Sequence, residues 1–325
     1  MRTLVIGGTE FIGRHTVEEL LRRGHEVTIF HRGHSPNPFG DRVRERLGDR
    51  LRPRDIRDAL AAEQFDAVID LVYVWGPGTG PREVSAVLDA VQVGLRRYVF
   101  LSSCGVYVLG GSVPATEDSP RGPSLGKYSA DKIATEDYLL SAQEESRVDV
   151  SIVRPPHVYG PYNNVPRESW FWDRIVAGRP VVVPDEGKTL THLAAVWDVA
   201  WALGECSENP AARGEVFNVA HSEPVSEADL VDLLGEAAGR SVEKVFVPRS
   251  RIYDLGGSVS SAPLYFAVAL DAEVDLAVDI SKAIRTLGFR PTEPLDGLRK
   301  TFEWYMRADR GRSPKFSFDK MLLGR

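Results

Sequence analysis

The first half of the chain alternates short apolar runs with longer segments in which apolar residues recur every three or four positions. Five apolar runs are predicted strands, over residues 4–6, 26–30, 66–72, 97–101 and 150–153. Helical periodicity lies between them, most clearly over 11–23 and 128–143. Strands that alternate with helices in this way form parallel sheets covered on both faces. We therefore predict an α/β fold with a doubly wound parallel sheet, in which ligands bind at the carboxyl ends of the strands.

After residue 161 the pattern becomes less regular. Proline, glycine and aromatic residues are more frequent over 162–188, which indicates a second, smaller region. Residues 194–206 and 215–220 then have the pattern of one more helix and one more strand of the sheet, so the two regions interleave. We assign 1–161 and about 192–222 to the sheet domain, about 162–191 and 223–309 to the smaller region, and 310–325 to a solvated tail.

The composition is ordinary for a globular protein, with 43% hydrophobic and 26% charged residues. The 40 basic and 46 acidic residues give a net charge of -6, which offers no general attraction to nucleic acid or to an anionic membrane. Cys104 and Cys206 are expected to be free thiols in a reducing compartment. The sequence has no zinc-ligand cluster, no apolar run of transmembrane length and no signal-peptide pattern. We therefore expect a cytoplasmic protein with no metal site.

A glycine-containing turn, GGTEFIG at residues 7–13, joins the first predicted strand to the first predicted helix. Glycine lets the backbone approach a pyrophosphate closely, and the helix N-terminus offers free N–H groups and the positive end of a dipole. The turn therefore predicts a dinucleotide site. Its expected cofactor contacts are Gly7, Gly8, Thr9, Phe11, Ile12 and Gly13. Glu10 stands where a middle glycine is usual, and we expect its carboxylate to point to solvent, away from the phosphates.

The second predicted strand ends at His31 and Arg32. NAD-binding folds usually place an acidic residue near this point, where it binds the ribose 2′-hydroxyl. Arg32 suits a 2′-phosphate instead, so NADP is favoured as the cofactor and NAD is the alternative. Asp49 follows the presumed third strand and is expected to accept a hydrogen bond from the adenine amine. Leu71 and Pro155 lie at the ends of later strands and are expected to contact the cofactor.

Tyr128 and Lys132 are four residues apart and lie on one face of a predicted helix. A neighbouring ammonium favours the phenolate and lowers the pKa of a tyrosine, which then exchanges a proton with a carbinol near neutral pH. Lys132 is also placed to hold the ribose hydroxyls of the cofactor. Ser102 and Ser103 follow the strand at 97–101, where a serine hydroxyl binds the substrate oxygen opposite the tyrosine.

With these motifs the chain resembles the extended short-chain dehydrogenases/reductases, the family of NAD-dependent epimerases and dehydratases. The resemblance covers nearly the whole chain, because the family patterns Ser-Ser-x-x-Val-Tyr, Arg-Pro-x-x-Val-Tyr-Gly-Pro and Asp-Val-Ala recur at 102–107, 154–161 and 198–200. It implies a Rossmann-type fold and hydride transfer with a nicotinamide cofactor. It also implies that Ser103, Tyr128 and Lys132 are the catalytic residues, with Ser102 as the second choice for the serine.

Three departures from the family pattern concern the substrate. Cys104 and Gly105 replace the acidic pair of the 4,6-dehydratases, so dehydration is not expected. His157 ends a motif in which members that act on nucleotide sugars often carry asparagine, and Thr191 replaces an arginine that often grips the diphosphate. We therefore expect a sugar-like substrate with an unusual or absent nucleotide. The residues expected to line its pocket are Ser102, His157, Arg167, Trp170 and Trp172.

The predicted function is hydride transfer at a secondary alcohol or ketone carbon of a sugar-like small molecule, as net keto-reduction or as epimerisation through a transient ketone. One alternative is an ordinary nucleotide-diphosphate-sugar epimerase. The turn without its middle glycine also resembles an atypical branch that includes chloroplast stem-loop RNA-binding proteins, so RNA binding on the same fold is the other alternative. The net charge gives RNA binding little support. We expect a small-molecule partner, no nucleic acid or membrane, and a homodimer as the candidate assembly.

Overall fold

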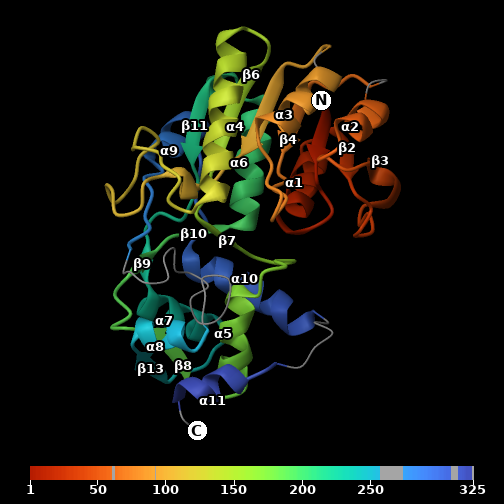
Figure 1. Ribbon diagram of the computed structural model, residues 1–325. Coiled ribbons are helices and arrows are strands. Elements are labelled where there is room, and N and C mark those ends of the chain that lie inside the picture. The colour runs from red at the N-terminus through yellow and green to blue at the C-terminus, as the bar shows by residue number, and fades with distance from the viewer. Residues whose placement is uncertain (61–62, 92, 257–273, 309–313, 324–325) are drawn as a thin grey trace. The chain divides into compact units, whose positions relative to one another are not determined.

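A computed structural model describes residues 1–60, 63–91, 93–256, 274–308 and 314–323 (Figure 1). The chain divides into two compact units. Unit 1 comprises Met1–Pro156, Val196–Ala220 and Val278–Arg290, and unit 2 comprises His157–Ala195, His221–Ala277 and Pro291–Arg325. The units interleave along the chain, and residues 278–290, which the sequence pattern placed in the smaller region, belong to unit 1. Residues 257–273 of the expected smaller region lie outside the described residues.

Unit 1 is built on a seven-stranded parallel sheet in the order β11-β6-β5-β4-β1-β2-β3. The strands are β1 (Arg2–Ile6), β2 (Glu26–His31), β3 (Arg44–Leu47), β4 (Ala67–Asp70), β5 (Arg97–Leu101), β6 (Asp149–Arg154) and β11 (Glu215–Asn218). The strand order changes direction between β1 and β4. In open α/β sheets, ligands bind at the carboxyl ends of the strands at such a point. The doubly wound parallel sheet predicted from the sequence is confirmed.

Helices cover both faces of this sheet. On one face α1 (Phe11–Arg22) packs against α6 (Val196–Glu208), and α9 (Ser281–Leu287) packs against α6 and β11. On the other face α3 (Pro81–Val91) packs between α2 (Pro53–Leu60) and α4 (Lys127–Glu144). Short 3-10 turns lie at Gly40–Arg42, Cys104–Val106 and Pro210–Ala212. The core beneath α2, α3 and α4 is mainly apolar and fixes the strand ends that carry the candidate site.

Strand β4 ends at Asp70, two residues before the predicted end. The Arg50 guanidinium donates to both carboxylate oxygens of Asp70, at 2.5 and 2.9 Å, and to the Val72 carbonyl at 2.7 Å. The Tyr98 hydroxyl donates to the same carboxylate at 2.6 Å. Because a buried side chain takes the Val72 carbonyl, the backbone leaves the sheet there although its residues remain apolar.

The described residues of unit 2 form three two-stranded sheets and five helices. The strand pairs are parallel β7 (His157–Tyr159) with β10 (Leu193–Ala195), antiparallel β9 (Leu190–Thr191) with β12 (Val225–Ser226), and parallel β8 (Val181–Pro184) with β13 (Lys244–Val247). The helices are α5 (Arg167–Val176), α7 (Glu227–Ala237), α8 (Arg249–Asp254), α10 (Pro294–Arg307) and α11 (Ser317–Leu323). Helix α7 packs against both α5 and α10.

The C-terminal segment is not a solvated tail over residues 317–323. Leu322 of α11 packs against Val182 and Ile252 of unit 2, and Asp319 is 2% exposed. The Asp319 carboxylate accepts a hydrogen bond from the buried Arg174 guanidinium at 2.8 Å. The basic residues of this segment predicted exposure. Apolar residues such as Leu322 and the acid Asp319 instead hold the segment against the rest of unit 2.

None of the helices in the described part of the chain combines the length and the apolar character that crossing a bilayer requires. Within the same residues, histidine, cysteine and carboxylate side chains form no group suited to a metal ion. Cys104 and Cys206 are both buried free thiols, and burial raises the pKa of each to about 12.

Candidate active site

The turn after β1 has a geometry that only glycine satisfies. Gly7 and Gly8 have φ angles of 109° and 107°, a region that L side chains rarely adopt. A Cβ on Gly13 would lie 2.6 Å from the Gly8 nitrogen, so α1 begins directly against the turn. The first turn of α1 has no acidic residue and no side-chain cap, which leaves its N–H groups for an anionic ligand. These features fit a pyrophosphate.

The other residues of the turn support this fit. Glu10 is exposed, as expected, and its carboxylate accepts a hydrogen bond from the Ser35 hydroxyl. Thr9, Phe11 and Ile12 are half-buried within the turn. The end of β4 lies beside it, because a Cβ on Gly7 would lie 3.0 Å from Val72 Cγ2 and 3.9 Å from Leu71 Cβ.

The end of β2 offers a cation where NAD-binding folds usually offer an acid. The His31 imidazole accepts from the Gly33 N–H at 3.2 Å, so its Nε2 donates to Glu45 at 2.7 Å. Arg32 is exposed and makes no side-chain hydrogen bond or ion pair with any residue that the structure describes. Asp49 is half-buried, and one of its carboxylate oxygens accepts from the Leu51 N–H at 3.0 Å.

Lys132 is buried in α4 with only 3% of its surface exposed. Its ammonium donates to the Leu101 carbonyl at the end of β5 at 2.7 Å. The ring centroids of Phe100, Tyr73 and Tyr128 lie 4.5, 5.8 and 6.0 Å from this nitrogen. Burial lowers the pKa of Lys132 to about 8, while the charge of Asp70 partly opposes this effect. A lysine with this pKa is still mostly protonated at neutral pH.

Ser103 and Tyr128 come together at the turn over Cys104–Val106. A Cβ on Gly105 would lie 3.3 Å from Ser103 Oγ and 3.5 Å from Tyr128 Cε1. Ser103 Oγ accepts from the Gly105 N–H at 3.0 Å, and the Ser129 hydroxyl donates to the Gly105 carbonyl at 2.7 Å. These bonds fix the serine and the N-terminus of α4 to one another. The absence of a side chain at Gly105, noted in the sequence as a lost acid, is what makes the approach possible.

Ser102, the second choice for the catalytic serine, and Pro155, an expected cofactor contact, also lie at this edge of the sheet. Ser102 is buried, and its hydroxyl has no hydrogen-bond partner among the described residues, which is uncommon for a buried polar atom. Pro155 is buried after β6, and its carbonyl accepts from the Cys104 N–H at 3.0 Å. Both therefore lie where β5 and β6 end.

Sequence reasoning missed two aromatic residues that surround Tyr128. The Trp75 ring stacks on the Tyr128 ring, with centroids 5.0 Å apart and planes inclined by 16°. Tyr73 meets Tyr128 edge to face at 4.9 Å, and its hydroxyl donates to Asp131 at 3.0 Å. Both follow β4 in the same way that Ser102 and Ser103 follow β5, and this was the signal that could have identified them.

Within unit 2, three of the residues singled out for the substrate lie close together. The His157 imidazole pairs with the Thr191 hydroxyl at 3.1 Å. Burial, helped by the nearby positive charge of Arg167, lowers the pKa of His157 well below its usual range, so this imidazole is neutral at pH 7. A neutral imidazole, a hydroxyl and a guanidinium can together bind a polar ligand.

The two tryptophans of α5 are packing residues. Trp172 is completely buried, its indole N–H donates to the Leu234 carbonyl at 3.1 Å, and its ring contacts Phe302 and Tyr305. Trp170 is also buried, with the Arg174 guanidinium 3.4 Å from its ring centroid. The structure thus places Trp172 in the core and not on a pocket wall, because its position on α5 faces α7 and α10.

Comparison with known proteins identifies the family. The sequence pattern of the NAD-dependent epimerase/dehydratase family matches residues 3–220. The chain belongs to this family. It is therefore an enzyme of the short-chain dehydrogenase/reductase type with a NAD-dependent chemistry, as its motifs indicated.

Two relatives and one solved structure illustrate what the chain is similar to. The chloroplast stem-loop binding protein of 41 kDa b of Arabidopsis thaliana is 29% identical over 100% of this chain and 84% of its own length. The 2′-dehydrokanamycin reductase of Streptomyces kanamyceticus is 30% identical over 76% of this chain and 70% of its own. The structure of MoeE5 in complex with UDP-glucose and NAD is 26% identical, with a TM-score of 0.72 over 94% of this chain and 99% of that chain.

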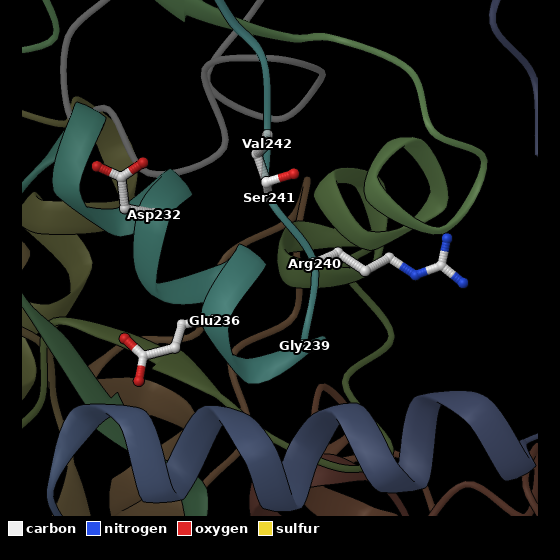
Figure 2. A pocket seen from close by; sticks show the side chains of 6 residues that line it. All are labelled: Asp232, Glu236, Gly239, Arg240, Ser241 and Val242. Carbon is white, nitrogen blue, oxygen red and sulfur yellow. The ribbon is translucent and has the colours of Figure 1, made fainter.

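A surface pocket at the end of α7 lies outside the motifs of the epimerase/dehydratase family. Figure 2 shows Arg240 pointing away from the carboxylates of Asp232 and Glu236. Asp232 pairs with Lys244, Glu236 pairs with Arg299, and Arg240 donates to a backbone carbonyl of α5. Because its charged side chains already have partners, this pocket is a poor candidate for the substrate site.

Proposed function

We propose that the chain is an NADP-dependent enzyme that transfers a hydride at a secondary alcohol or ketone carbon of a sugar-like small molecule. The observation that carries this proposal is the meeting of Ser103 and Tyr128 at Gly105, with the Lys132 ammonium 6.0 Å from the phenol ring. The glycine turn and the open N-terminus of α1 would hold the cofactor. When bound, the nicotinamide supplies or accepts the hydride.

The side chains then carry out the proton chemistry. In reduction, the Ser103 hydroxyl donates a hydrogen bond to the substrate carbonyl oxygen, and Tyr128 gives that oxygen its phenolic proton as the carbon–hydrogen bond forms. The Lys132 ammonium favours the phenolate that remains. In the reverse direction the phenolate takes the proton from the alcohol. Epimerisation uses both directions in turn, and net reduction uses one.

Replacing Tyr128 with phenylalanine tests this assignment. Tyr128→Phe removes the proton donor but leaves the ring and its stacking, so turnover should fall by about two to four orders of magnitude. The Kd for the cofactor should stay within about twofold. Tyr138→Phe, on the same helix and also half-buried, is the matched control and should keep full activity. Retained turnover in Tyr128→Phe would overturn the scheme.

The preference for NADP rests on Arg32. The Arg32 guanidinium, which directly follows β2, is exposed and has no partner among the described residues, so it is available for a 2′-phosphate. A hydrogen bond to a charged group is worth about 1.5–3 kcal/mol. NADPH should therefore bind about 10- to 100-fold tighter than NADH, and Arg32→Ala should remove most of that difference. Arg54→Ala, which changes another exposed arginine, is the control. An unchanged preference in Arg32→Ala would show that Arg32 is not the determinant, equal affinities in the unaltered enzyme would refute the preference for NADP, and tighter binding of NADH would favour NAD.

The proposed substrate is polyhydroxylated and lacks an ordinary nucleotide diphosphate. Thr191 pairs with His157 where many family members have an arginine for the diphosphate, and Arg167 is the cation that lies near them. A relative named as a reductase is consistent with net reduction, and relatives named as UDP-glucose 4-epimerases are equally consistent with epimerisation, so the comparison does not separate the two reactions. The test is thermal unfolding of the enzyme with saturating NADP and, in turn, polyhydroxylated small molecules, UDP or dTDP. A ligand at a hundred times its Kd adds about 2.7 kcal/mol to the free energy of unfolding. Strong stabilisation by UDP or dTDP alone would reinstate the ordinary nucleotide-sugar epimerase.

RNA binding on the same fold is the less favoured function. The Ser103, Tyr128 and Lys132 set is retained, and the net charge of -6 offers no general attraction to a polyanion. Filter binding of RNA over a salt series would reveal such an activity. A homodimer and a cytoplasmic location also remain proposals, which light scattering and fractionation of the native cells would test.

A further inference from the structure

Trp75 combines two properties that rarely occur together. Its exposed fraction, 74%, is the highest of the large hydrophobic side chains in the described residues, yet its ring stacks on half-buried Tyr128. An exposed indole keeps a large apolar surface in water, and apolar surface left exposed next to polar groups commonly marks a binding site. One part of Trp75 therefore covers the phenol, while the rest of its surface is available to a ligand.

The segment that carries Trp75 is held at several points. Arg50 donates to the Val72 carbonyl at its start, and the Tyr73 hydroxyl donates to Asp131 on α4. The Val74 N–H then donates to Thr79 Oγ1 at 2.9 Å. Asp131 also accepts from Lys127, so Tyr73 is bound to an ion pair at the N-terminus of α4. These bonds make the segment a fixed wall beside Tyr128.

We propose that Tyr73 and Trp75 form an aromatic shelf that selects substrates whose reacting carbon belongs to a ring with an apolar face. This inference rests on the proposed function, because the substrate oxygen must reach the Tyr128 phenol. Trp75 occupies one face of the phenol, so a substrate whose oxygen meets the hydroxyl places its body against the exposed indole. A ring ketone then buries apolar surface on Trp75, as aromatic walls in ligand sites do, whereas a short open-chain ketone does not reach it.

The experiment compares ring and open-chain ketones in Trp75→Ala and Trp75→Phe. Tetrahydropyran-4-one and cyclohexanone are assayed against hydroxyacetone and acetone, each with NADPH and NADH. We expect kcat/KM for the ring ketones to fall about tenfold or more in Trp75→Ala, mainly through KM, and for the open-chain ketones to change less than about threefold. Trp75→Phe should keep most of the ring preference. Phe246→Ala, an exposed aromatic on β13, is the control and should change neither.

Two results would overturn the shelf. Equal losses for ring and open-chain ketones in Trp75→Ala would show that Trp75 only supports Tyr128. A loss of affinity for the cofactor with an unchanged KM would show that the indole serves the nicotinamide.

None of the four ketones is polyhydroxylated, so an unaltered enzyme that reduces none of them leaves the proposed hydride transfer to the Tyr128→Phe test and gives no kinetic measure of the shelf. The shelf is then judged by saturation-transfer NMR with tetrahydropyran-4-ol and glycerol in the presence of NADP. Binding of the ring alcohol that is lost in Trp75→Ala supports the shelf, and binding that is absent or unaffected by the substitution rejects it.

Discussion

Lys132 should lower the stability of the fold while it serves the chemistry. Its pKa falls from 10.5 to about 8 in the folded protein because the ammonium is buried. The difference between these pKa values corresponds to about 3 kcal/mol that folding loses at neutral pH. Lys132→Met keeps the length of the side chain and removes the charge, but it also takes a donor from the Leu101 carbonyl, which costs about 1 kcal/mol. The variant should thus be more stable by about 2 kcal/mol at pH 7, although it loses turnover.

The dependence on pH gives this prediction its sign. The folded pKa is below the unfolded one, so the unfolded state binds more protons between about pH 8 and 10.5. Stability of the unaltered enzyme therefore rises with pH through that window relative to the variant, which has no such group. The advantage of Lys132→Met should be full at pH 7 and close to zero, or reversed, at pH 10.5.

Urea unfolding of both proteins at pH 7, 9 and 10.5 measures this difference. Lys320→Met, which changes an exposed lysine on α11, is the control and should shift stability by less than about 0.5 kcal/mol. Destabilisation of Lys132→Met at pH 7, or a gap that does not depend on pH, would refute the reasoning that burial is the dominant cause of the shifted pKa.

Two further predictions concern the glycine turn and two buried histidines. Gly13→Ala should weaken cofactor binding strongly and destabilise the fold by about 1–3 kcal/mol, because the new Cβ would lie 2.6 Å from the Gly8 nitrogen; titration with NADPH and thermal unfolding measure both effects. Gly80→Ala, which meets open space, is its control, and equal affinities would contradict the proposed site. Burial lowers the pKa of His192 and His221 to about 4, so the unfolded state binds more protons and stability should fall from about pH 6.5 towards pH 4. Urea unfolding at pH 7, 5.5 and 4.5 tests this. Replacing both histidines with glutamine should reduce the slope, while buried His157, whose pKa is also lowered, keeps part of it; a slope that the replacement leaves unchanged would assign it to other groups.

Local patterns in the sequence predicted most of the fold. The alternation of apolar strands with helices and the glycine turn depend on neighbours in the chain, so the parallel sheet and its cofactor edge were recognisable. The end of β4 was not, because Val72 leaves the sheet through a contact with Arg50, more than twenty residues away. The residues just before and just after the end of β4 are equally apolar, so the sequence pattern does not mark where the strand ends.

The candidate site divides in the same way. Tyr128 and Lys132 were found because a spacing of four on a helix fixes their common face, and Ser103 because it follows a core strand. Trp75 and Trp172 have the same side chain, yet one is exposed over the phenol and the other is in the core of unit 2. The position of Trp75 after a core strand was a signal that it lies near the site, but its stacking on Tyr128 depends on what the rest of the chain places beside it.

The interleaving of the two units limits how this enzyme can be assembled and altered. The chain passes from one unit to the other five times. Unit 1 therefore cannot complete its sheet during synthesis until β11 emerges, after residues 157–195 of unit 2 have already been made. For the same reason unit 2 cannot be exchanged with that of a relative by a single crossover, since a graft would need a compatible junction at each passage. New specificity in such an architecture is reached by substitutions in place, at positions such as those that follow the strands.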